Sequence, residues 1–247
     1  MMLSLAIIIV LGLALGSFVN VCAYRIPRGI SVVSVPSSCP HCHTRLSWVE
    51  LIPLLSFALQ RGRCASCERK ISWRYPISEL FAAAALVLLY LKLGASTGFV
   101  LSASFILVMA VVAVVDWEFF IIPNRVLIVG GALGLALKGL FDISILTESL
   151  VSAFLAIVVA FSLRLVANAL FRRQSLGMGD VKLAALVGFF LGVKLFFITF
   201  WIAAIFGLIY GITKAKQSRF VPLGSMMGAS SYLVLLFHDS MLALFSQ

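Results

Sequence analysis

Two of the aspartates and four of the five cysteines could do chemistry, because each lies in a short polar stretch of a mostly apolar chain. Asp180 ends the glycine-rich stretch Gly177-Met178-Gly179-Asp180 at the boundary of a long apolar segment. A carboxylate at the edge of a membrane segment is costly unless it has a partner or a task. Asp116, at the end of another apolar segment, is the partner that we expect for Asp180.

A pair of carboxylates can hydrolyse a peptide bond without a covalent intermediate. Like charges at close range cannot both ionise cheaply, so the two acids would share one proton and titrate as a unit. The neutral acid can donate a hydrogen bond to the peptide carbonyl while the ionised one takes a proton from water. We therefore predict Asp116 and Asp180 as the catalytic residues. Three neighbours would support the approach of a substrate backbone: Gly177, Gly179 and Lys182.

The cysteines form two C-x2-C hooks in a basic segment: Cys39, Cys42, Cys64 and Cys67. Each hook can present two thiolates to one tetrahedral ion, and the spacing is typical of a four-cysteine zinc site. Zn2+ held by four thiolates has no open coordination position, so the predicted site is structural. His41 and His43 lie beside the first hook and are alternatives, either as ligands or as groups behind the ligands.

The composition places these residues in a membrane protein. The chain has 247 residues, of which 62% are hydrophobic and 11% charged, and a mean hydropathy of +1.14. We expect an all-α, polytopic protein that has the lipid bilayer as a partner. The net charge of +10 could indicate a nucleic-acid partner, but the basic residues fall between apolar spans, where they normally mark the cytoplasmic side. We therefore expect no nucleic-acid partner.

The alternation of apolar and polar segments predicts three parts. Residues 1–24 form a first transmembrane helix, without the basic start and cleavage site of a removable signal peptide. Residues 25–78 form a small cytoplasmic domain that needs a metal as a staple, and residues 79–247 form a transmembrane helical catalytic domain. About eight spans are expected, the last seven near 79–92, 98–116, 126–141, 145–171, 181–193, 195–213 and 221–245.

The distribution of basic residues indicates which side of the membrane each loop faces. If residues 25–78 lie in the cytoplasm, fifteen Lys and Arg fall on the inside and three, among them Lys138, fall in outside turns. Arg164 is left within a span. This bias is the usual mark of topology, and it places Asp116 and Asp180 at the same, cytoplasmic face.

Other interpretations of the two acids are open. They could cap helices or pair with Arg125 and Lys182. A transporter or channel would use them to relay protons or bind cations, but it would spread its acids through the membrane depth and would give no role to the cysteines. A non-catalytic scaffold that docks partners through the hooks would need neither acid.

Several motifs follow one another over nearly the whole chain: Gly16-Ser17-Phe18-Val19-Asn20-Val21, Tyr24-Arg25-Ile26-Pro27, the two cysteine hooks, Arg74-Tyr75-Pro76 with Glu79, Asp116, Gly177-Met178-Gly179-Asp180 and Val221-Pro222-Leu223-Gly224. Their order resembles the type IV prepilin peptidases, a family of G-x-G-D membrane aspartic proteases. The resemblance implies a bacterial inner-membrane endopeptidase that removes the basic leader from prepilins or pseudopilins at the cytoplasmic face. Asp116 and Asp180 would be its catalytic pair.

The same resemblance implies a second activity. Many members of the family N-methylate the new N-terminal residue from S-adenosylmethionine, and that activity is associated with the cytoplasmic domain, which residues 25–78 match. Three positions depart from the family pattern: Asn124 stands where many relatives have Asp, and Leu223 and Ser225 stand where Phe and Pro are common. We expect Asn124 to supply no carboxylate, and the changes at 223 and 225 to affect only local packing.

Overall fold

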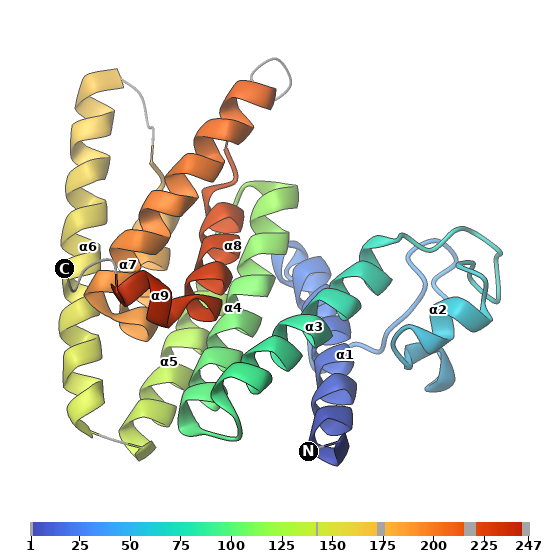
Figure 1. The fold of residues 1–247 in the computed structure, drawn as a ribbon. Coiled ribbons are helices and arrows are strands. Elements are labelled where there is room, and N and C mark those ends of the chain that lie inside the picture. Colours follow the sequence, from blue (N-terminus) through green and yellow to red (C-terminus); the bar gives the residue numbers. More distant parts are fainter. Residues whose placement is uncertain (1, 142, 172–175, 215–220, 244–247) are drawn as a thin grey trace. The chain divides into compact units, whose positions relative to one another are not determined.

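A computed structural model describes residues 2–141, 143–171, 176–214 and 221–243 (Figure 1). Across these ranges the regular structure is helical, apart from two isolated β-bridges. This confirms the prediction of an all-α protein. The chain divides into two compact units, Met1–Lys92 and Leu93–Gln247. The finer domain boundaries at residues 24 and 78 stay predictions.

The N-terminal unit contains α1 (Met2–Arg25), η1 (Ile26–Arg28), η2 (Val49–Leu51), α2 (Leu55–Leu59) and α3 (Arg74–Leu93). Small residues bring α1 and α3 together. A Cβ on Gly12 would lie 2.5 Å from the Cα atom of Ala83, and a Cβ on Gly16 would lie 2.7 Å from the Cα atom of Glu79. Glycines one turn apart therefore let the two backbones touch, as is common between membrane helices.

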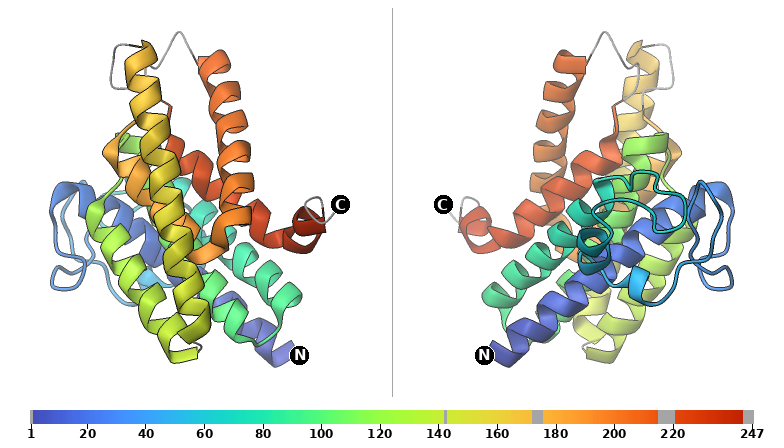
Figure 2. Two further views of the ribbon diagram at one scale, coloured as in Figure 1. Left: turned by 90° about the vertical axis from the view of Figure 1, so that its left-hand side faces the viewer. Right: turned by 90° about the vertical axis from the view of Figure 1, so that its right-hand side faces the viewer.

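The C-terminal unit contains α4 (Thr97–Phe119), α5 (Asn124–Phe141), α6 (Ile143–Phe171), α7 (Met178–Lys214), α8 (Leu223–Leu236) and α9 (His238–Ala243). α6 packs along α7, and α8 packs against both α4 and α7 (Figures 1 and 2). The large side chains that are buried between these helices include Phe105, Met109, Phe196 and Met227. α8 is thus the element that joins the helix of Asp116 to the helix of Asp180.

A kink divides α7. Gly192 has φ 80° and ψ 169°, values that no helix has and that favour glycine. A buried cation stabilises the segment before the kink: Nζ of Lys138, in α5, donates hydrogen bonds to the carbonyl oxygen of Phe189 and to Oγ of Ser149, both at 2.6 Å. Carbonyls at the end of a helical segment are natural partners for a cation. The alternation of spans and loops had placed Lys138 in an outside turn. In the structure, Lys138 instead lies within α5 and its side chain is buried.

Within the described residues, six helices are long and apolar enough to cross a membrane: α1, α3, α4, α5, α6 and α7. These confirm a multi-pass membrane protein, but the predicted count of eight spans is not confirmed. The expected span 221–245 is wrong as one helix, because α8 ends at Leu236 and α9 starts at His238. The polar pair of His238 and Asp239, with Nδ1 and Oδ1 3.0 Å apart, interrupts the apolar run there.

Candidate active site and metal centre

Asp116 lies in the last turn of α4 and is only 5% exposed. The helix ends directly after it, since Phe120 takes a left-handed conformation and its N–H donates to the carbonyl of Asp116. The side chain points to the start of α8, where the backbone N–H of Ser225 donates to Oδ2 of Asp116 at 3.0 Å. A buried carboxylate is thus oriented by a backbone donor from a helix far along the chain.

Asp180 lies in the first turn of α7 and is half-buried. Its Oδ2 accepts a hydrogen bond from the backbone N–H of Gly177 at 2.8 Å. A Cβ on Gly177 would lie 3.0 Å from that same oxygen, so a side chain there would push the carboxylate away. Gly177 therefore positions Asp180 directly.

The two acids interact. The Asp180 carboxylate exerts an electrostatic effect on Asp116, although the two come from different helices. The connection between α4 and α5 lies against the start of α7, because a Cβ on Gly179 would lie 3.1 Å from Cβ of Ile122. Gly179 is small for this internal contact. Its predicted role in making room for a substrate backbone stays a prediction, as does that of Gly177.

Lys182 lies one turn into α7 and reaches the start of α5. Its Nζ donates to Oδ1 of Asn124 at 3.0 Å. The position where many relatives have a carboxylate therefore still supplies an oxygen to the Lys182 ammonium. The hydrogen bond joins the helix of Asp180 to the segment that follows Asp116. The predicted role of Lys182 in supporting the approach of a substrate stays a prediction.

Arg164, in α6, is a residue of this site whose role the sequence left unexplained. Its guanidinium exerts an electrostatic effect on Asp180, and its Nη1 is buried without a hydrogen-bond partner among the described residues. The signal that could have found it is a lone arginine in the middle of a 29-residue apolar helix, because a charge there is costly unless it faces a partner.

The start of α8 also does more than the sequence suggested. A Cβ on Gly224 would lie 3.1 Å from Oδ2 of Asp116, and the next residue, Ser225, supplies the N–H that Asp116 accepts. Oγ of Ser225 donates to the carbonyl of Ala113 at 2.6 Å. The expectation that position 225 affects only local packing is therefore wrong for this chain, since the residue contacts the acid itself.

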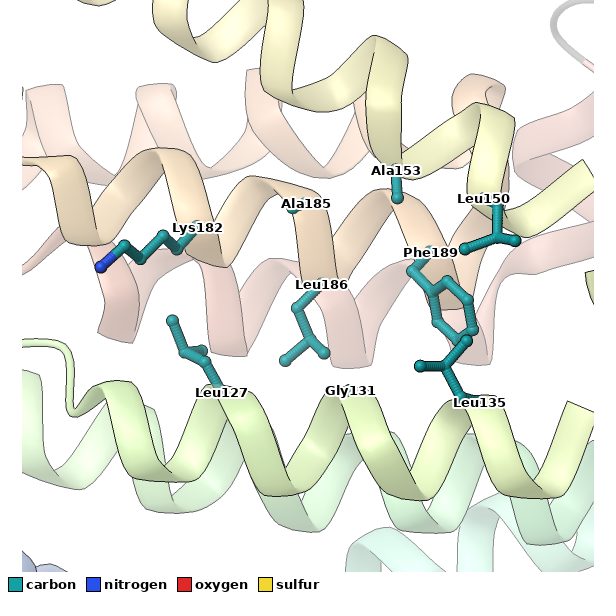
Figure 3. A pocket seen from close by; sticks show the side chains of 9 residues that line it. All are labelled: Leu127, Gly131, Leu135, Leu150, Ala153, Lys182, Ala185, Leu186 and Phe189. Atoms are coloured by element: carbon teal, nitrogen blue, oxygen red, sulfur yellow. The ribbon is translucent and has the colours of Figure 1, made fainter.

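An apolar groove of about 210 Å³ lies beside the start of α7 (Figure 3). Its walls come from α5, α6 and α7, and its lining is Leu127, Gly131, Leu135, Leu150, Ala153, Lys182, Ala185, Leu186 and Phe189. Lys182 is its one charged lining residue and lies at one end (Figure 3). Because Lys182 follows Asp180 closely in the same helix, the groove leads away from the candidate active site.

The N-terminal unit brings the four predicted cysteines together. The sulfur atoms of Cys39, Cys42, Cys64 and Cys67 all lie within 4.8 Å of one another. Two of the separations are 3.9 Å and 4.0 Å. Four thiolates about 2.3 Å from one tetrahedral ion would be about 3.8 Å apart, so this donor set fits Zn2+.

Both hooks have the same backbone. In each, the N–H four residues after the first cysteine donates to the carbonyl of that cysteine, from His43 to Cys39 at 3.0 Å and from Glu68 to Cys64 at 2.9 Å. His43 and Glu68 both have positive φ, and an isolated β-bridge closes each hook. Each half of the cluster is therefore formed by residues that are close in sequence.

His41, beside the first hook, contacts the segment that follows the second hook, because its Nδ1 lies 3.1 Å from Nη1 of Arg69. Among the described residues, the group of potential metal ligands consists of the four cysteines and contains neither His41 nor His43. Hydrogen bonds from the side chain and then the backbone of Thr44 lower the pKa of the Cys42 thiol to about 6. This favours the thiolate form, which is the form that binds a metal.

Comparisons with known proteins identify the family. Residues 10–93 match the Bacterial Peptidase A24 N-terminal domain, and residues 103–212 match the Type IV leader peptidase family. A "Prepilin leader peptidase/N-methyltransferase" of Bacillus subtilis is 33% identical over 98% of this chain and 97% of its own length. The protein of that name from Myxococcus xanthus is 32% identical over 82% of this chain and 61% of its own length.

A third relative is the "Type 4 prepilin-like proteins leader peptide-processing enzyme" of Escherichia coli O78:H11, which is 31% identical over 92% of this chain and 93% of its own length. No solved structure matches the chain. Because the two matched regions include both cysteine hooks and both acids, and because relatives match nearly end to end, the chain belongs to the type IV leader peptidase family.

Proposed function

We propose that this protein is an aspartic endopeptidase that removes the basic leader from type IV prepilins or pseudopilins, with Asp116 and Asp180 as its catalytic pair. The observation that carries the proposal is the placement of the two acids: they end α4 and begin α7, and each carboxylate is oriented by one backbone N–H. The electrostatic effect of Asp180 on Asp116 supports a pair that acts together.

In the proposed reaction the pair shares one proton. The protonated acid donates it toward the carbonyl oxygen of the scissile peptide while the ionised acid takes a proton from a water molecule. The water oxygen bonds to the carbonyl carbon, and the carbon–nitrogen bond then breaks as the leaving nitrogen receives a proton. No covalent bond to the enzyme forms, because the attacking group is the water molecule and not a side chain.

The apolar groove supports a membrane-embedded substrate. A prepilin carries a basic leader before an apolar helix, so its apolar part can lie in lipid or in the groove beside Lys182 while the leader stays at the membrane surface. The excess of basic residues on one side argues for an active site that faces the cytoplasm from the bacterial inner membrane.

We further propose that the new N-terminal residue is methylated from S-adenosylmethionine, because the relatives' names include this activity. S-adenosylmethionine would supply an electrophilic methyl group. In the N-terminal unit, the four thiolates would hold one structural Zn2+ and so join the two hooks into one folded segment.

The test is a cleavage assay with purified enzyme in lipid and a prepilin substrate. Asp116→Asn or Asp180→Asn alone should abolish leader removal, since loss of either member of such a pair removes general acid–base catalysis. Asp239→Asn, at an exposed acid in α9, makes the same chemical change away from the site and should cleave normally. Normal cleavage by either of the first two variants would exclude the proposed pair.

A further inference from the structure

We propose that Glu79 and Asn20, where α1 meets α3, form a second site that binds the α-amino group released by cleavage and accepts its proton before methylation. This inference rests on the proposed N-methylation. The two residues belong to one unit and lie on helices in backbone contact, because a Cβ on Gly16 would lie 2.7 Å from the Cα atom of Glu79.

Glu79 is a buried carboxylate that has no part in the proposed peptidase reaction. Its side chain is 6% exposed. Oε2 accepts a hydrogen bond from the backbone N–H of Leu54 at 2.9 Å, and the Ser17 hydroxyl bonds the same carboxyl group. Both of these donors are uncharged. A buried acid whose partners among the described residues are all neutral is costly, and it offers a place for a positive charge.

Asn20 supplies an unused acceptor in the same place. Its side chain is 1% exposed, and Nδ2 donates to Oγ of Ser78 at 2.6 Å and to the carbonyl of Gly16 at 3.3 Å. The carbonyl can only accept, which fixes the amide orientation. Oδ1 then remains buried with no hydrogen-bond partner among the described residues. An unpaired buried acceptor costs free energy that a ligand donor would recover.

Together, the carboxylate and the amide oxygen call for a ligand that brings both N–H donors and positive charge. An ammonium group has both. Leader cleavage creates such a group, the α-ammonium of the shortened pilin, where a peptide nitrogen without charge existed before. The site would therefore favour the product of cleavage over the uncut chain.

A strained turn covers this acid. Leu54 has φ 59° and ψ −46°, and the N–H of Leu55 donates to the carbonyl of Pro53 at 2.6 Å, which makes a γ-turn of the rare type with positive φ. Such a conformation is costly for leucine. This turn directs the N–H of Leu54 to Oε2 of Glu79. In the proposed site, opening of the turn would admit the amine.

The proposed proton transfer prepares the amine for methylation. Glu79 takes a proton from the bound ammonium, which leaves a neutral nitrogen with a free electron pair, and Oδ1 of Asn20 accepts one remaining N–H. That nitrogen then forms a bond to the methyl carbon as the carbon–sulfur bond of S-adenosylmethionine breaks. The products are a secondary ammonium, which bears the positive charge, and neutral S-adenosylhomocysteine. General-base assistance of this kind typically contributes 10²- to 10⁴-fold.

The experiment measures cleavage and methylation separately, by mass spectrometry, on the full-length enzyme with a prepilin and S-adenosylmethionine. Glu79→Gln should keep cleavage within about twofold and lose about 100-fold or more in methylation rate. Raising the pH through the α-amino range, about 7.7–8.0, should restore part of the loss, because the amine then loses its proton to solvent. Glu50→Gln, at a half-buried acid of the same unit that accepts hydrogen bonds from the backbone and hydroxyl of Ser47, should change neither activity.

Binding gives a readout that needs no methyl donor. Wild-type enzyme should bind a mature pilin peptide with a free N-terminus about tenfold more tightly than the N-acetylated peptide, as charged hydrogen bonds predict. Glu79→Gln and Asn20→Leu should lose that preference. Glu79→Asp keeps the negative charge and should retain part of the preference, which would show that the loss in Glu79→Gln is not caused by misfolding.

Three results would overturn the inference: equal methylation by Glu79→Gln and wild type, equal binding of free and acetylated peptides by wild type, or a loss of S-adenosylmethionine binding in the variants in place of the loss of peptide preference. The last would assign the site to the methyl donor's own ammonium. Loss of cleavage in Asp116→Asn is independent of all three, so failure here leaves the proposed peptidase standing.

Discussion

The cysteine cluster of the N-terminal unit and the aspartate pair of the C-terminal unit bring reactive groups together in different ways. Each cysteine hook is formed by its own short segment, with the same hydrogen bond and the same positive-φ residue in both. Asp116 and Asp180 instead depend on α8, whose first turn contacts Asp116 and whose body packs against both α4 and α7. The metal centre is local, whereas the acid pair is tertiary.

The difference decides what each site needs in order to stay formed. Two complete hooks still need an ion to join them, because four thiolates within 4.8 Å repel one another unless a cation holds them. The acid pair needs no ion in its proposed role, but it needs tight packing where Gly224 contacts Asp116 and Gly177 contacts Asp180. The predictions below separate these two kinds of dependence.

The largest effect should come from breaking the metal centre alone. Cys39→Ser together with Cys64→Ser removes one thiolate from each hook, so bound zinc should fall from about one per chain to near zero. Segment 31–73 should then become sensitive to protease, while the helices of the C-terminal unit stay protected. Zinc content by mass spectrometry and limited proteolysis measure both. Disulfides in the purified wild type, in place of zinc, would contradict the assignment.

A smaller but specific effect should follow from filling the space beside Asp116. In Gly224→Ala, the new Cβ would lie 3.1 Å from Oδ2 of Asp116, and displacement of a catalytic group by a fraction of an ångström should cost about tenfold in kcat. Gly228→Ala is the matched control, because its Cβ would lie 3.1 Å from the Ala113 methyl, one turn further along the same helix. Equal kcat values for the two variants would show that Asp116 does not depend on this contact.

Arg164 offers a way to change the charge around one acid only. Arg164→Gln should lower kcat about tenfold with little change in KM. A tenfold change corresponds to roughly 1.4 kcal/mol, which is a reasonable size for the loss of one charge–charge interaction near the protein surface. Arg164→Lys keeps the positive charge and should recover part of the loss. If KM rises and kcat does not change, Arg164 contacts the substrate and does not act through Asp180.

The smallest effect should come from the hydrogen bond at Ser225. Ser225→Pro removes the N–H that bonds Asp116 and should cost a few-fold in kcat, as one hydrogen bond of about 0.5–1.5 kcal/mol predicts. Proline fits this place, since position 225 lies in the first turn of α8. Ser225→Ala keeps the N–H and should cleave nearly as wild type does, so an equal loss in both variants would assign the effect to Oγ.

Much of the site could be predicted because its residues carry strong local signals. Two C-x2-C pairs in a basic segment indicate a metal site, and an acid between glycines at the edge of an apolar run indicates a functional carboxylate. Arg164 and Ser225 carry no such signal of their roles. A lone arginine shows that it needs a partner but not which one, and the N–H of Ser225 is a backbone group that every residue except proline has.

The sequence by itself determined the all-α membrane class, the presence of several long apolar helices although not their number, and the grouping of the cysteines into hooks, because hydropathy and short spacings act within a few residues. Only the tertiary structure decided that α8 holds Asp116, that Arg164 acts on Asp180, that Lys138 is buried against Phe189 and that Glu79 and the unpaired Oδ1 of Asn20 are both buried where α1 meets α3. These contacts depend on which helix faces pack together. Apolar periodicity leaves that choice open, since nearly every face of such a helix is hydrophobic.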